Sequence, residues 1–365
     1  MNVPRLRFKE FNDEYKSIKL KDVSEIYDGT HETPNYVEKG VKFVSVENIS
    51  NLLDTPKFIP ESDYNKYKIK PKYNDVFMTR IGDIGTSSIY KSDEKLAYYV
   101  SLALLRTKDN HILIPDYLNQ YIKNNSFQKE LYNRTIHVAF PKKINTGEIG
   151  ECSINLCSNK EQLKVSNFLS LLDKKIELQT KKIEDLKLFK LCINNILFNG
   201  NKTIKLKDIC ECKSSTISLS DIEYDDGIYP IYGANGEIKK INSYQNDKDY
   251  LAIIKDGAGV GKTIICNKKS SIIATLSALI PNDIPVYYFN ELINKIDFSK
   301  YIVGSGIPHI YFKDYSNEKL YLHEGKKRVL INNLFKRIII KIELEENKLH
   351  LLETVKKGLM QNMFV

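Results

Sequence analysis

The sequence predicts an α+β chain: two strand-rich domains separated by two long helices, which pair as an antiparallel coiled coil, with a pseudo-two-fold internal repeat. Three observations predict this architecture. A seven-residue motif occurs twice, a long heptad segment recurs with the same interruptions, and glycine turns separate short strand-like runs elsewhere. The length of 365 residues and the hydrophobic share of 42% are sufficient for more than one buried core.

Two pairs of matching segments define the repeat. Residues 17–23 (SIKLKDV) recur as residues 203–209 (TIKLKDI), and residues 175–178 (KIEL) recur as residues 341–344. The offsets are 186 and 166 residues, so the second copy is 20 residues shorter between these anchors. The chain therefore contains two copies of one unit.

Each copy ends in a long segment with heptad spacing. The a and d positions of the first segment run from Val165 to Leu197, and eight of the ten are apolar. The same positions 166 residues later, from Ile331 to Met363, again include eight apolar residues. The polar interruptions Gln179 and Lys190 also have polar counterparts in the second segment. A single such helix more often packs on its own domain, but two matching copies favour pairing with each other.

Two like units joined in this order close around a two-fold only if the paired helices run antiparallel. The residues predicted to pair the helices are Leu169, Leu172, Ile176, Ile183, Leu186, Phe335, Ile338, Ile342, Leu349 and Leu352.

The remaining segments set the domain boundaries. Strand-rich domains are predicted at residues 1–157 and 203–323, and helical spacers at residues 158–202 and 324–365.

Within the domains, short elements alternate with glycine turns. Residues 41–46 alternate with period two and predict a strand. Residues 115–122 predict a short helix that Pro115 opens, and residues 284–293 are a weaker counterpart. Glycine turns are predicted at residues 28–30, 82–85, 232–236 and 304–306.

Residues 256–263 (DGAGVGKT) end like a phosphate-binding P-loop. Asp256, however, stands where that loop requires its first glycine, and the segments that follow, residues 263–266 and 271–276, predict strands and no helix. We therefore predict a hairpin turn. A nucleotide-dependent enzyme built on Gly257–Thr263 stays open as an alternative.

Several other classes are excluded by pattern. The N-terminal residues lack the apolar run of a secretory signal, and no apolar stretch approaches the roughly 20 residues of a membrane span. The six cysteines form no CxxC pair, which favours reduced thiols in the cytoplasm and predicts no metal site. The motifs of amino-group methylation, of serine hydrolases and of zinc proteases are lacking, so we predict no catalytic residue.

Polar loops point to nucleic-acid recognition. Residues 28–36 offer hydroxyl, imidazole and amide groups, and Arg80 stands beside a glycine turn, where it could contact guanine or a phosphate. Residues 132–143 interleave basic and aromatic side chains. Residues 203–323 contain no arginine, so guanine there must be read by Lys, Asn, Ser or the backbone. For every such residue, an ordinary solvated loop position is an equally valid interpretation.

These landmarks together resemble the DNA-specificity subunit of Type I restriction-modification systems, over essentially the whole chain from about residue 14. The motifs that carry the resemblance are residues 26–34 (IYDGTHETP), 43–49 (FVSVENI), 78–86 (MTRIGDIGT), 97–104 (AYYVSLAL), 229–236 (YPIYGANG) and 256–261 (DGAGVG).

The resemblance implies a function. Each of the two target-recognition domains is expected to read one half of a bipartite site in double-stranded DNA, with the paired helices setting the spacing. Two methyltransferase (M) subunits are expected to dock on the chain and use S-adenosylmethionine, and restriction (R) subunits to use ATP and Mg²⁺. The chain itself is expected to carry no cofactor. A coiled-coil adaptor that binds protein and no DNA is the other alternative.

The candidate DNA-binding residues come from these loops and motifs. They are Tyr27, Thr30, His31, Thr33, Ser45, Glu47, Asn48, Arg80, Asp83, Thr86, Tyr99, Arg134, His137, Lys142, Lys143, Tyr232, Asn235, Lys255, Lys262, Lys268, Ser305, His309 and Tyr311.

One departure concerns the loops themselves. Residues 304–310 contain two glycines, whereas residues 135–142 in the first half contain none. Whether the two loops meet DNA in the same way stays open at this point.

The net charge of +9 is distributed unevenly. Each helical spacer carries nine basic and five acidic residues, or +4, whereas residues 14–157 and 203–323 carry +1 and −1. DNA contact by the two domains must therefore come from local clusters of charge and not from bulk attraction.

Overall fold

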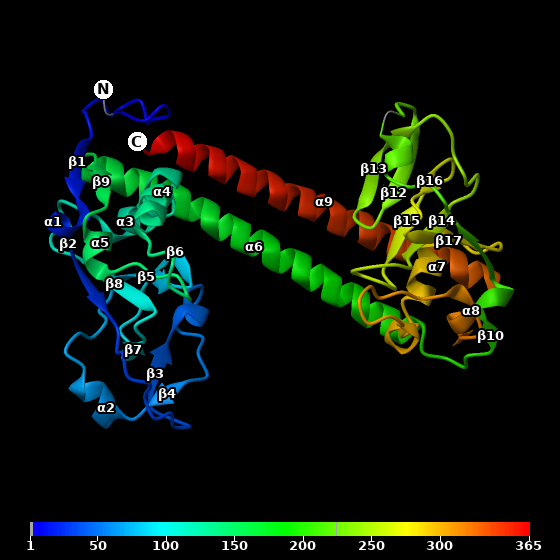
Figure 1. Cartoon of the computed structure of the whole chain (residues 1–365), viewed down its shortest axis with the longest axis horizontal. Helices are drawn as coiled ribbons and strands as arrows, with labels where there is room; N and C mark the ends of the chain where they lie inside the picture. Colours follow the sequence, from blue (N-terminus) through cyan, green and yellow to red (C-terminus); the bar gives the residue numbers. More distant parts are fainter. Residues whose placement is uncertain (1–2, 224) are drawn as a thin grey trace. The chain divides into compact units, whose positions relative to one another are not determined.

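The computed structural model describes residues 3–223 and 225–365, which divide into two compact units. Unit 1 consists of the chain up to residue 179 together with residues 348–365, and unit 2 consists of residues 180–347. Each unit therefore combines one strand-rich segment with part of both long helices, α6 and α9 (Figure 1).

Unit 1 contains a four-stranded antiparallel sheet of order β2-β8-β5-β6 and a three-stranded sheet of order β4-β3-β7. In the second sheet β3 pairs antiparallel with β4 and parallel with β7, while β1 and β9 form a separate ribbon. The strands are β1 (Lys16–Lys19), β2 (Ser24–Asp28), β3 (Val41–Val44), β4 (Phe58–Ile59), β5 (Val76–Ile81), β6 (Asp83–Ile89), β7 (Leu96–Tyr98), β8 (Leu102–Thr107) and β9 (Ser153–Leu156). The helices are α1 (Leu20–Val23), η1 (Val46–Asn48), α2 (Glu61–Lys66), α3 (Pro115–Ile122), α4 (Asn125–Arg134) and α5 (Thr146–Gly150).

Unit 2 has the same topology. Its sheets have the orders β11-β17-β14-β15 and β13-β12-β16, the second again with one antiparallel and one parallel pairing, and β10 pairs with β18. The strands are β10 (Ile204–Lys205), β11 (Cys210–Ser214), β12 (Tyr229–Gly233), β13 (Gly236–Ile241), β14 (Tyr250–Ile254), β15 (Thr263–Cys266), β16 (Ser271–Ile272), β17 (Leu276–Pro281) and β18 (Lys319–Leu320). The helices are η2 (Leu206–Asp208), η3 (Ser220–Ile222), α7 (Val286–Ile293), η4 (Phe298–Tyr301) and α8 (Phe312–Tyr315).

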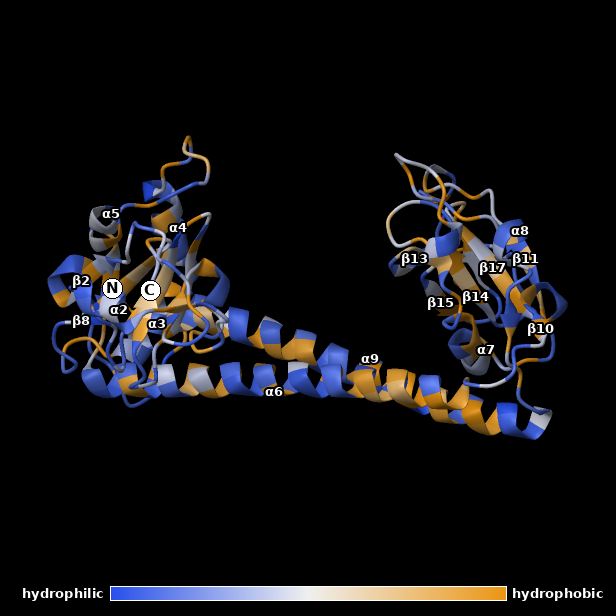
Figure 2. Ribbon diagram, turned by 90° about the horizontal axis from the view of Figure 1, so that it is seen from below, coloured by the Kyte–Doolittle hydropathy of each residue, from blue (hydrophilic) through white to orange (hydrophobic). Residues whose placement is uncertain are grey.

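The central strands β5 and β14 are buried on both faces, which explains their continuous apolar sequences. In β5, Val76 and Met78 enter the core beneath α3, whereas Phe77 enters a second core beside β7. In β14, Leu251 and Ile253 likewise face the core that contains α7, and the alternate residues face the other sheet. Figure 2 shows this concentration of apolar residues in the sheets of each unit.

The long helices α6 (Asn159–Leu197) and α9 (Gly325–Met363) have 39 residues each and contact each other in an antiparallel manner within each unit. In unit 1 Leu169, near the beginning of α6, shares a core with Met360 and Met363, near the end of α9. In unit 2 Leu186, in the second half of α6, packs against a core that contains Phe335, near the beginning of α9. All twenty a and d positions of the two heptad segments are buried or half-buried. This set includes the ten residues predicted to pair the helices.

Local geometry corrects three predicted boundaries. The strand at residues 41–46 ends at Val44, because Ser45 forms a capping box with Asn48 and starts η1. Residues 271–276 are one strand only as far as Ile272, since a turn follows before β17 begins at Leu276. The helix predicted at residues 284–293 begins two residues later, at Val286 after Pro285.

The hairpin predicted at residues 256–263 is present, because β14 and β15 pair antiparallel on either side of it. A strand begins at Thr263, where a P-loop requires the N-terminus of a helix.

The six cysteines are free thiols, and burial raises the pKa of Cys152 and Cys266 to about 12. In the described part of the chain, no helix has the length and apolar character needed to span a membrane.

Candidate nucleic-acid interface

Two surface loops correspond to each other in the two units. Loop A (residues 137–142) lies between Ile136 and Lys143, whose backbones pair as an antiparallel bridge. Loop B (residues 304–308) lies between Val303 and His309, which form the equivalent bridge with N–H···O distances of 2.9 and 2.8 Å.

Each loop is also attached to the glycine hairpin at the end of the central strand. The Gly82 N–H donates to the carbonyl of Lys142 at 2.8 Å, and the Gly257 N–H donates to the carbonyl of Pro308, also at 2.8 Å. Gly257 has a φ of +89°, a conformation that favours glycine. The two loops are therefore held on equivalent scaffolds although their sequences differ.

The same pairing makes Arg80 and Lys255 structural equivalents. The N–H of Ile144 donates to the carbonyl of Arg80, and the N–H of Ile310 donates to the carbonyl of Lys255, both at 3.0 Å. The Lys255 side chain is half-buried and forms an ion pair with Asp256 at 2.7 Å.

Arg80 itself lies inside unit 1. Its side chain is 7% exposed, Nε donates to the carbonyl of Ile144 at 3.1 Å, and Nη1 donates to the carbonyl of Val100 at 3.0 Å. Burial lowers the pKa of Arg80, while Asp28, at 3.6 Å, partly opposes this change. These contacts favour a structural role, in which Arg80 joins three segments beneath loop A, over the expected contact with a base or phosphate.

The end of β2 and the turn that follows it carry four of the candidates. The Tyr27 hydroxyl donates to Glu25 at 2.6 Å, and the exposed His31 lies 3.2 Å from Asp28. Thr30 accepts a hydrogen bond from the N–H of Glu32 and lines a cavity of about 220 Å³ beside Asp28. Thr33 is exposed on the same turn.

Other candidates of unit 1 are engaged within the fold. Ser45 and Asn48 form the capping box of η1, and Glu47 forms an ion pair with Lys57 at 3.2 Å. Tyr99 is half-buried against Phe43. In the β5–β6 hairpin, the Thr79 hydroxyl donates to the carboxylate of Asp83 and accepts a hydrogen bond from the N–H of Thr86.

Loop A brings several predicted residues together. His137 packs on Tyr132 with ring centroids 4.4 Å apart, and its Nε2 lies 2.9 Å from the carbonyl of Tyr132. Asp83, His137 and Lys142 line one cavity of about 220 Å³. Lys142 and Lys143 are exposed, whereas Arg134 is paired with Glu148 at 3.0 Å and with Glu130 at 3.4 Å.

In unit 2 the candidates form two groups. Ser305, His309 and Tyr311 lie in or beside loop B, where the rings of His309 and Tyr311 are 5.0 Å apart. Lys262 is exposed at the end of the adjoining glycine hairpin. The others lie on different segments: Tyr232, which is buried in β12, Asn235 in the turn that follows it, and Lys268 after β15.

Sequence reasoning missed the apolar residues at the two loop tips. Val138 and Phe140 in loop A are 97% and fully exposed, and Ile307 in loop B is 68% exposed. An apolar residue inside a polar, basic loop was the available signal, but its exposure depends on the loop's backbone path.

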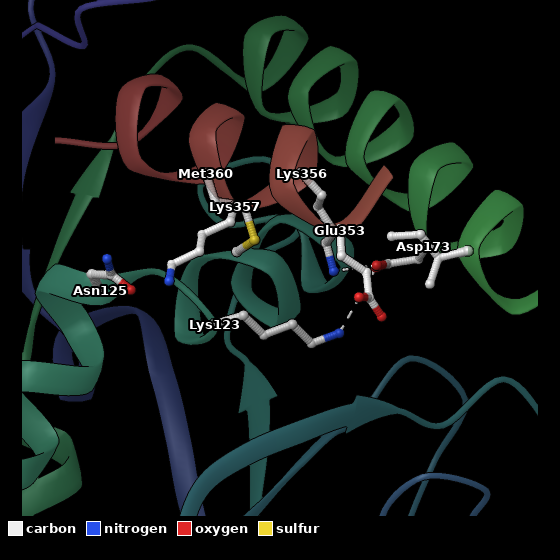
Figure 3. A pocket seen from close by; sticks show the side chains of 8 residues that line it. Lys123, Asn125, Asp173, Glu353, Lys356, Lys357 and Met360 are labelled. Carbon is white, nitrogen blue, oxygen red and sulfur yellow. Dashed lines mark ion pairs between the residues drawn. The ribbon is translucent and has the colours of Figure 1, made fainter. Parts of the chain in front are cut away.

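A separate cavity of about 350 Å³ lies in unit 1 where α3 and α4 meet the long helices (Figure 3). Lys123 and Lys356 both form ion pairs with Asp173 there, the first at 4.0 Å. Burial lowers the pKa of Lys123, and Asp173 partly opposes this effect. Because the carboxylates of Asp173 and Glu353 line this cavity beside the lysines, it offers little to an external anion.

Comparison with known proteins agrees with the internal repeat. A family model described as "Type I restriction modification DNA specificity domain" matches residues 12–188 and 199–354. The Type I restriction enzyme MjaVIII specificity subunit of Methanocaldococcus jannaschii is 26% identical over 206 residues. That match covers 54% of this chain and 48% of the relative, so the chain matches about half of the relative's length.

Solved structures show the same fold. The crystal structure of a Type I restriction-modification S subunit from M. genitalium has a TM-score of 0.73 at 17% identity, covering 100% of this chain and 99% of that one. A chain from a structure of complex assembly in a type I R-M system has a TM-score of 0.51 at 13% identity, with coverages of 97% and 98%. With both copies of the repeat matched by the family model, the chain belongs to the Type I restriction-modification DNA specificity family.

Proposed function

We propose that the chain is the sequence-specific DNA-recognition subunit of a Type I restriction-modification complex, with each unit reading one half of a bipartite target in double-stranded DNA. The observation that carries this proposal is the correspondence of loops A and B. The two units hold them with the same backbone hydrogen bonds, at Gly82 and at Gly257, yet present different side chains. A shared scaffold with divergent tips suits two readers of different sequences.

The chemistry of the two loops suits a DNA duplex. Loop A offers Lys142 for phosphates, together with the adjoining Lys143, and His137 for a base edge. Loop B has Ser305 in the comparable place, followed by His309 in the bridge, with Lys262 on the adjoining hairpin. Because the net charge of each strand-rich segment is close to zero, these local groups must supply the attraction to phosphate.

The long helices supply the second part of the proposal, which is the spacing of the half-sites and the docking of two methyltransferase subunits. Both helices expose apolar side chains away from the seam that pairs them, a pattern that favours a further helical or protein partner. The exposed residues are Leu163, Leu171, Leu178, Leu188, Phe189, Leu191 and Ile196 on α6, and Val329, Leu330, Leu334, Ile340, Leu344, Leu351 and Val355 on α9.

Catalysis is assigned to the partner subunits. The methyltransferase subunits are proposed to bind S-adenosylmethionine, and restriction subunits, where they join the complex, to use ATP and Mg²⁺. The contribution of this chain is to select the DNA and to position the enzymes on it.

The test begins with the chain assembled with its methyltransferase subunits in a host that lacks other adenine methylation. Single-molecule methylome sequencing identifies the target, and the affinity of the complex is then measured at fixed salt for that duplex and for duplexes with either half scrambled. We expect each scrambled half to weaken binding by at least about tenfold, since each mismatched pair costs about 1–3 kcal/mol.

A loop variant assigns the halves to the units. His309→Ala in loop B is expected to relax recognition of one half-site and leave the other unchanged, and His137→Ala in loop A to do the reverse. If the assembled complex bound all duplexes with the same affinity, the proposal would be wrong. A complex without any salt-sensitive DNA footprint would favour a protein adaptor instead.

A further inference from the structure

The tips of loops A and B hold apolar side chains that the described residues of their own unit leave largely in solvent. Phe140 is fully exposed and Val138 is 97% exposed, while Ile307 at the tip of loop B is 68% exposed. An apolar side chain stabilises a fold when it is buried away from water. A Phe that stays fully in solvent therefore contributes nothing to the stability of its own unit. The same feature at equivalent places in two units points to contact with a partner.

The bases of both loops are fixed, so that the tips are held away from the surface. In loop A the Ile136–Lys143 bridge, the Gly82 hydrogen bond and the packing of His137 on Tyr132 hold the base. In loop B, Gly304 has a φ of +96°, and a Cβ there would lie 2.9 Å from Nδ1 of His309. The turn is therefore compact and available only to glycine.

The charge around the tips identifies the partner as duplex DNA. Phe140 is followed within three residues by Lys142 and Lys143, both exposed, and Lys262 projects from the hairpin beside loop B. A phosphate backbone attracts such cations, and behind it lie stacked bases that an apolar side chain can enter. A hydrophobic protein surface would not attract these lysines as a phosphate backbone does.

We propose that Phe140, supported by Val138, enters a groove of the duplex as an apolar wedge and partly unstacks one base step in the half-site of unit 1. Ile307 makes the corresponding contact, with a smaller side chain, in the half-site of unit 2. This proposal rests on the proposed function, because it specifies how the same loops meet DNA.

The wedge adds a mode of sequence selection that needs no hydrogen bond to a base. Pyrimidine–purine steps open more readily than others, so the step at the wedge is selected by its deformability. The loss on removing an apolar wedge is consequently a loss of base unstacking as well as of affinity.

The experiment uses the assembled complex and its target duplex, with 2-aminopurine placed in turn at each permissive position of the unit 1 half-site. The wild-type complex is expected to raise the fluorescence at one step. Phe140→Ala should abolish that increase and weaken binding by about 10-fold to 100-fold at fixed salt, as for removal of an aromatic side chain that stacks on a base. Phe140→Leu, which retains an apolar wedge, should keep most of both signals.

Matched variants separate the wedge from other effects. Tyr73→Ala removes an aromatic side chain of unit 1 that is 52% exposed on another loop, and it should change neither signal. Ile307→Ala should affect only the half-site of unit 2. Because Phe140 is fully exposed, its replacement should leave the thermal unfolding of the complex unchanged.

Three results overturn the wedge: no fluorescence change with the wild-type complex, wild-type binding by Phe140→Ala, or weaker binding with the fluorescence change intact. In each of them, a wild-type complex that still discriminates its target leaves the proposed function standing. A wild-type complex that does not discriminate its target overturns both proposals.

Discussion

His323 is 5% exposed, and its backbone and its imidazole both contact the hydroxyl of Tyr288. The backbone N–H of His323 donates to the hydroxyl of Tyr288 at 3.0 Å, and the same hydroxyl lies within hydrogen-bonding distance of Nδ1 of His323, at 2.9 Å. Burial lowers the pKa of His323, and the nearby Lys327 lowers it further.

This geometry predicts how unit 2 responds to acid. Because the pKa of His323 is lower in the folded chain, the unfolded chain binds a proton first as the pH falls through about 6.5, its ordinary value. The free energy of unfolding should therefore decrease between pH 7.5 and 5.5, by up to about 1.4 kcal/mol per pH unit from this group. Urea unfolding at a series of pH values measures this change in the free energy of unfolding. His323→Gln should flatten the slope, whereas replacing the exposed His111 by Gln should not; equal slopes in both variants would contradict the assignment.

Single residues also show where sequence reasoning stops. Arg80 lies near the end of the apolar strand β5, two residues before Gly82, a position that favours an exposed functional arginine. Its burial depends on carbonyls of Val100 and Ile144, which are 20 and 64 residues away and are brought there by β8 and by loop A. No local pattern contains that information. The exposure of Phe140 could not be predicted from the sequence either, since apolar residues are usually assigned to the core.

Among the elements, α3 and α7 are joined to the long helices by related polar contacts. In unit 2 Glu291 on α7 is almost completely buried and binds Lys190 of α6 at 2.6 Å. In unit 1 the equivalent residue is Gln120 on α3, which donates to Asp173 of α6 at 2.8 Å, and Asp173 pairs with Lys356. Lys190 and Lys356 occupy matching heptad positions. The carboxylate partner lies on the short helix α7 in unit 2 and on the long helix α6 in unit 1.

Breaking the buried pair should destabilise unit 2 strongly. Lys190→Met leaves the carboxylate of Glu291 buried without its cation, and we expect the free energy of unfolding to decrease by about 3–5 kcal/mol. Adding Glu291→Gln should recover much of the loss, since unit 1 uses glutamine at this position. Urea unfolding provides the measurement. Lys187→Met breaks a half-exposed pair with Glu346 and should cost less than about 1 kcal/mol. A similar cost for both lysine variants would show that burial is not decisive.

The elements that were predicted best are those whose signals are local. Pro115 opens α3, and the helix occupies residues 115–122 as predicted. The heptad segments became the long helices, because a repeated apolar seam needs only one partner surface. In contrast, the strand predicted at residues 41–46 ends at Val44. The side chain of Ser45 caps η1, and this local hydrogen bonding competes with continuation of the strand.

At the scale of the whole molecule, the proposed spacing role depends on the length of the paired helices. One heptad inserted in both helices, after residues 179 and 347, keeps the seam in phase and adds about 10 Å along the helix axis. The tolerated gap between half-sites should then increase by about three base pairs, at about 3.4 Å per pair. Methylome sequencing of a host that carries the longer chain reads the new gap directly.

The control is a heptad inserted in α6 alone. It puts the two helices out of alignment and should prevent assembly of the complex or disturb the gap. An assembled complex with both insertions and an unchanged gap would contradict the spacing role. Retained assembly without DNA discrimination would instead indicate that the insertion had damaged a unit.

The end of α9 completes the core of unit 1. Phe364 packs against Tyr117 and Tyr121 at centroid distances of 5.6 and 5.4 Å, and the carbonyl of Val365 accepts a hydrogen bond from Asn155 at 2.9 Å. During synthesis, residues 180–347 must be made after the first part of unit 1 and before this final piece. At 5–20 residues per second, the tyrosines of α3 wait roughly 12 to 50 s for their partner. For that interval the nascent chain presents an incomplete core, so chaperones have most to protect in the half of the protein that is made first.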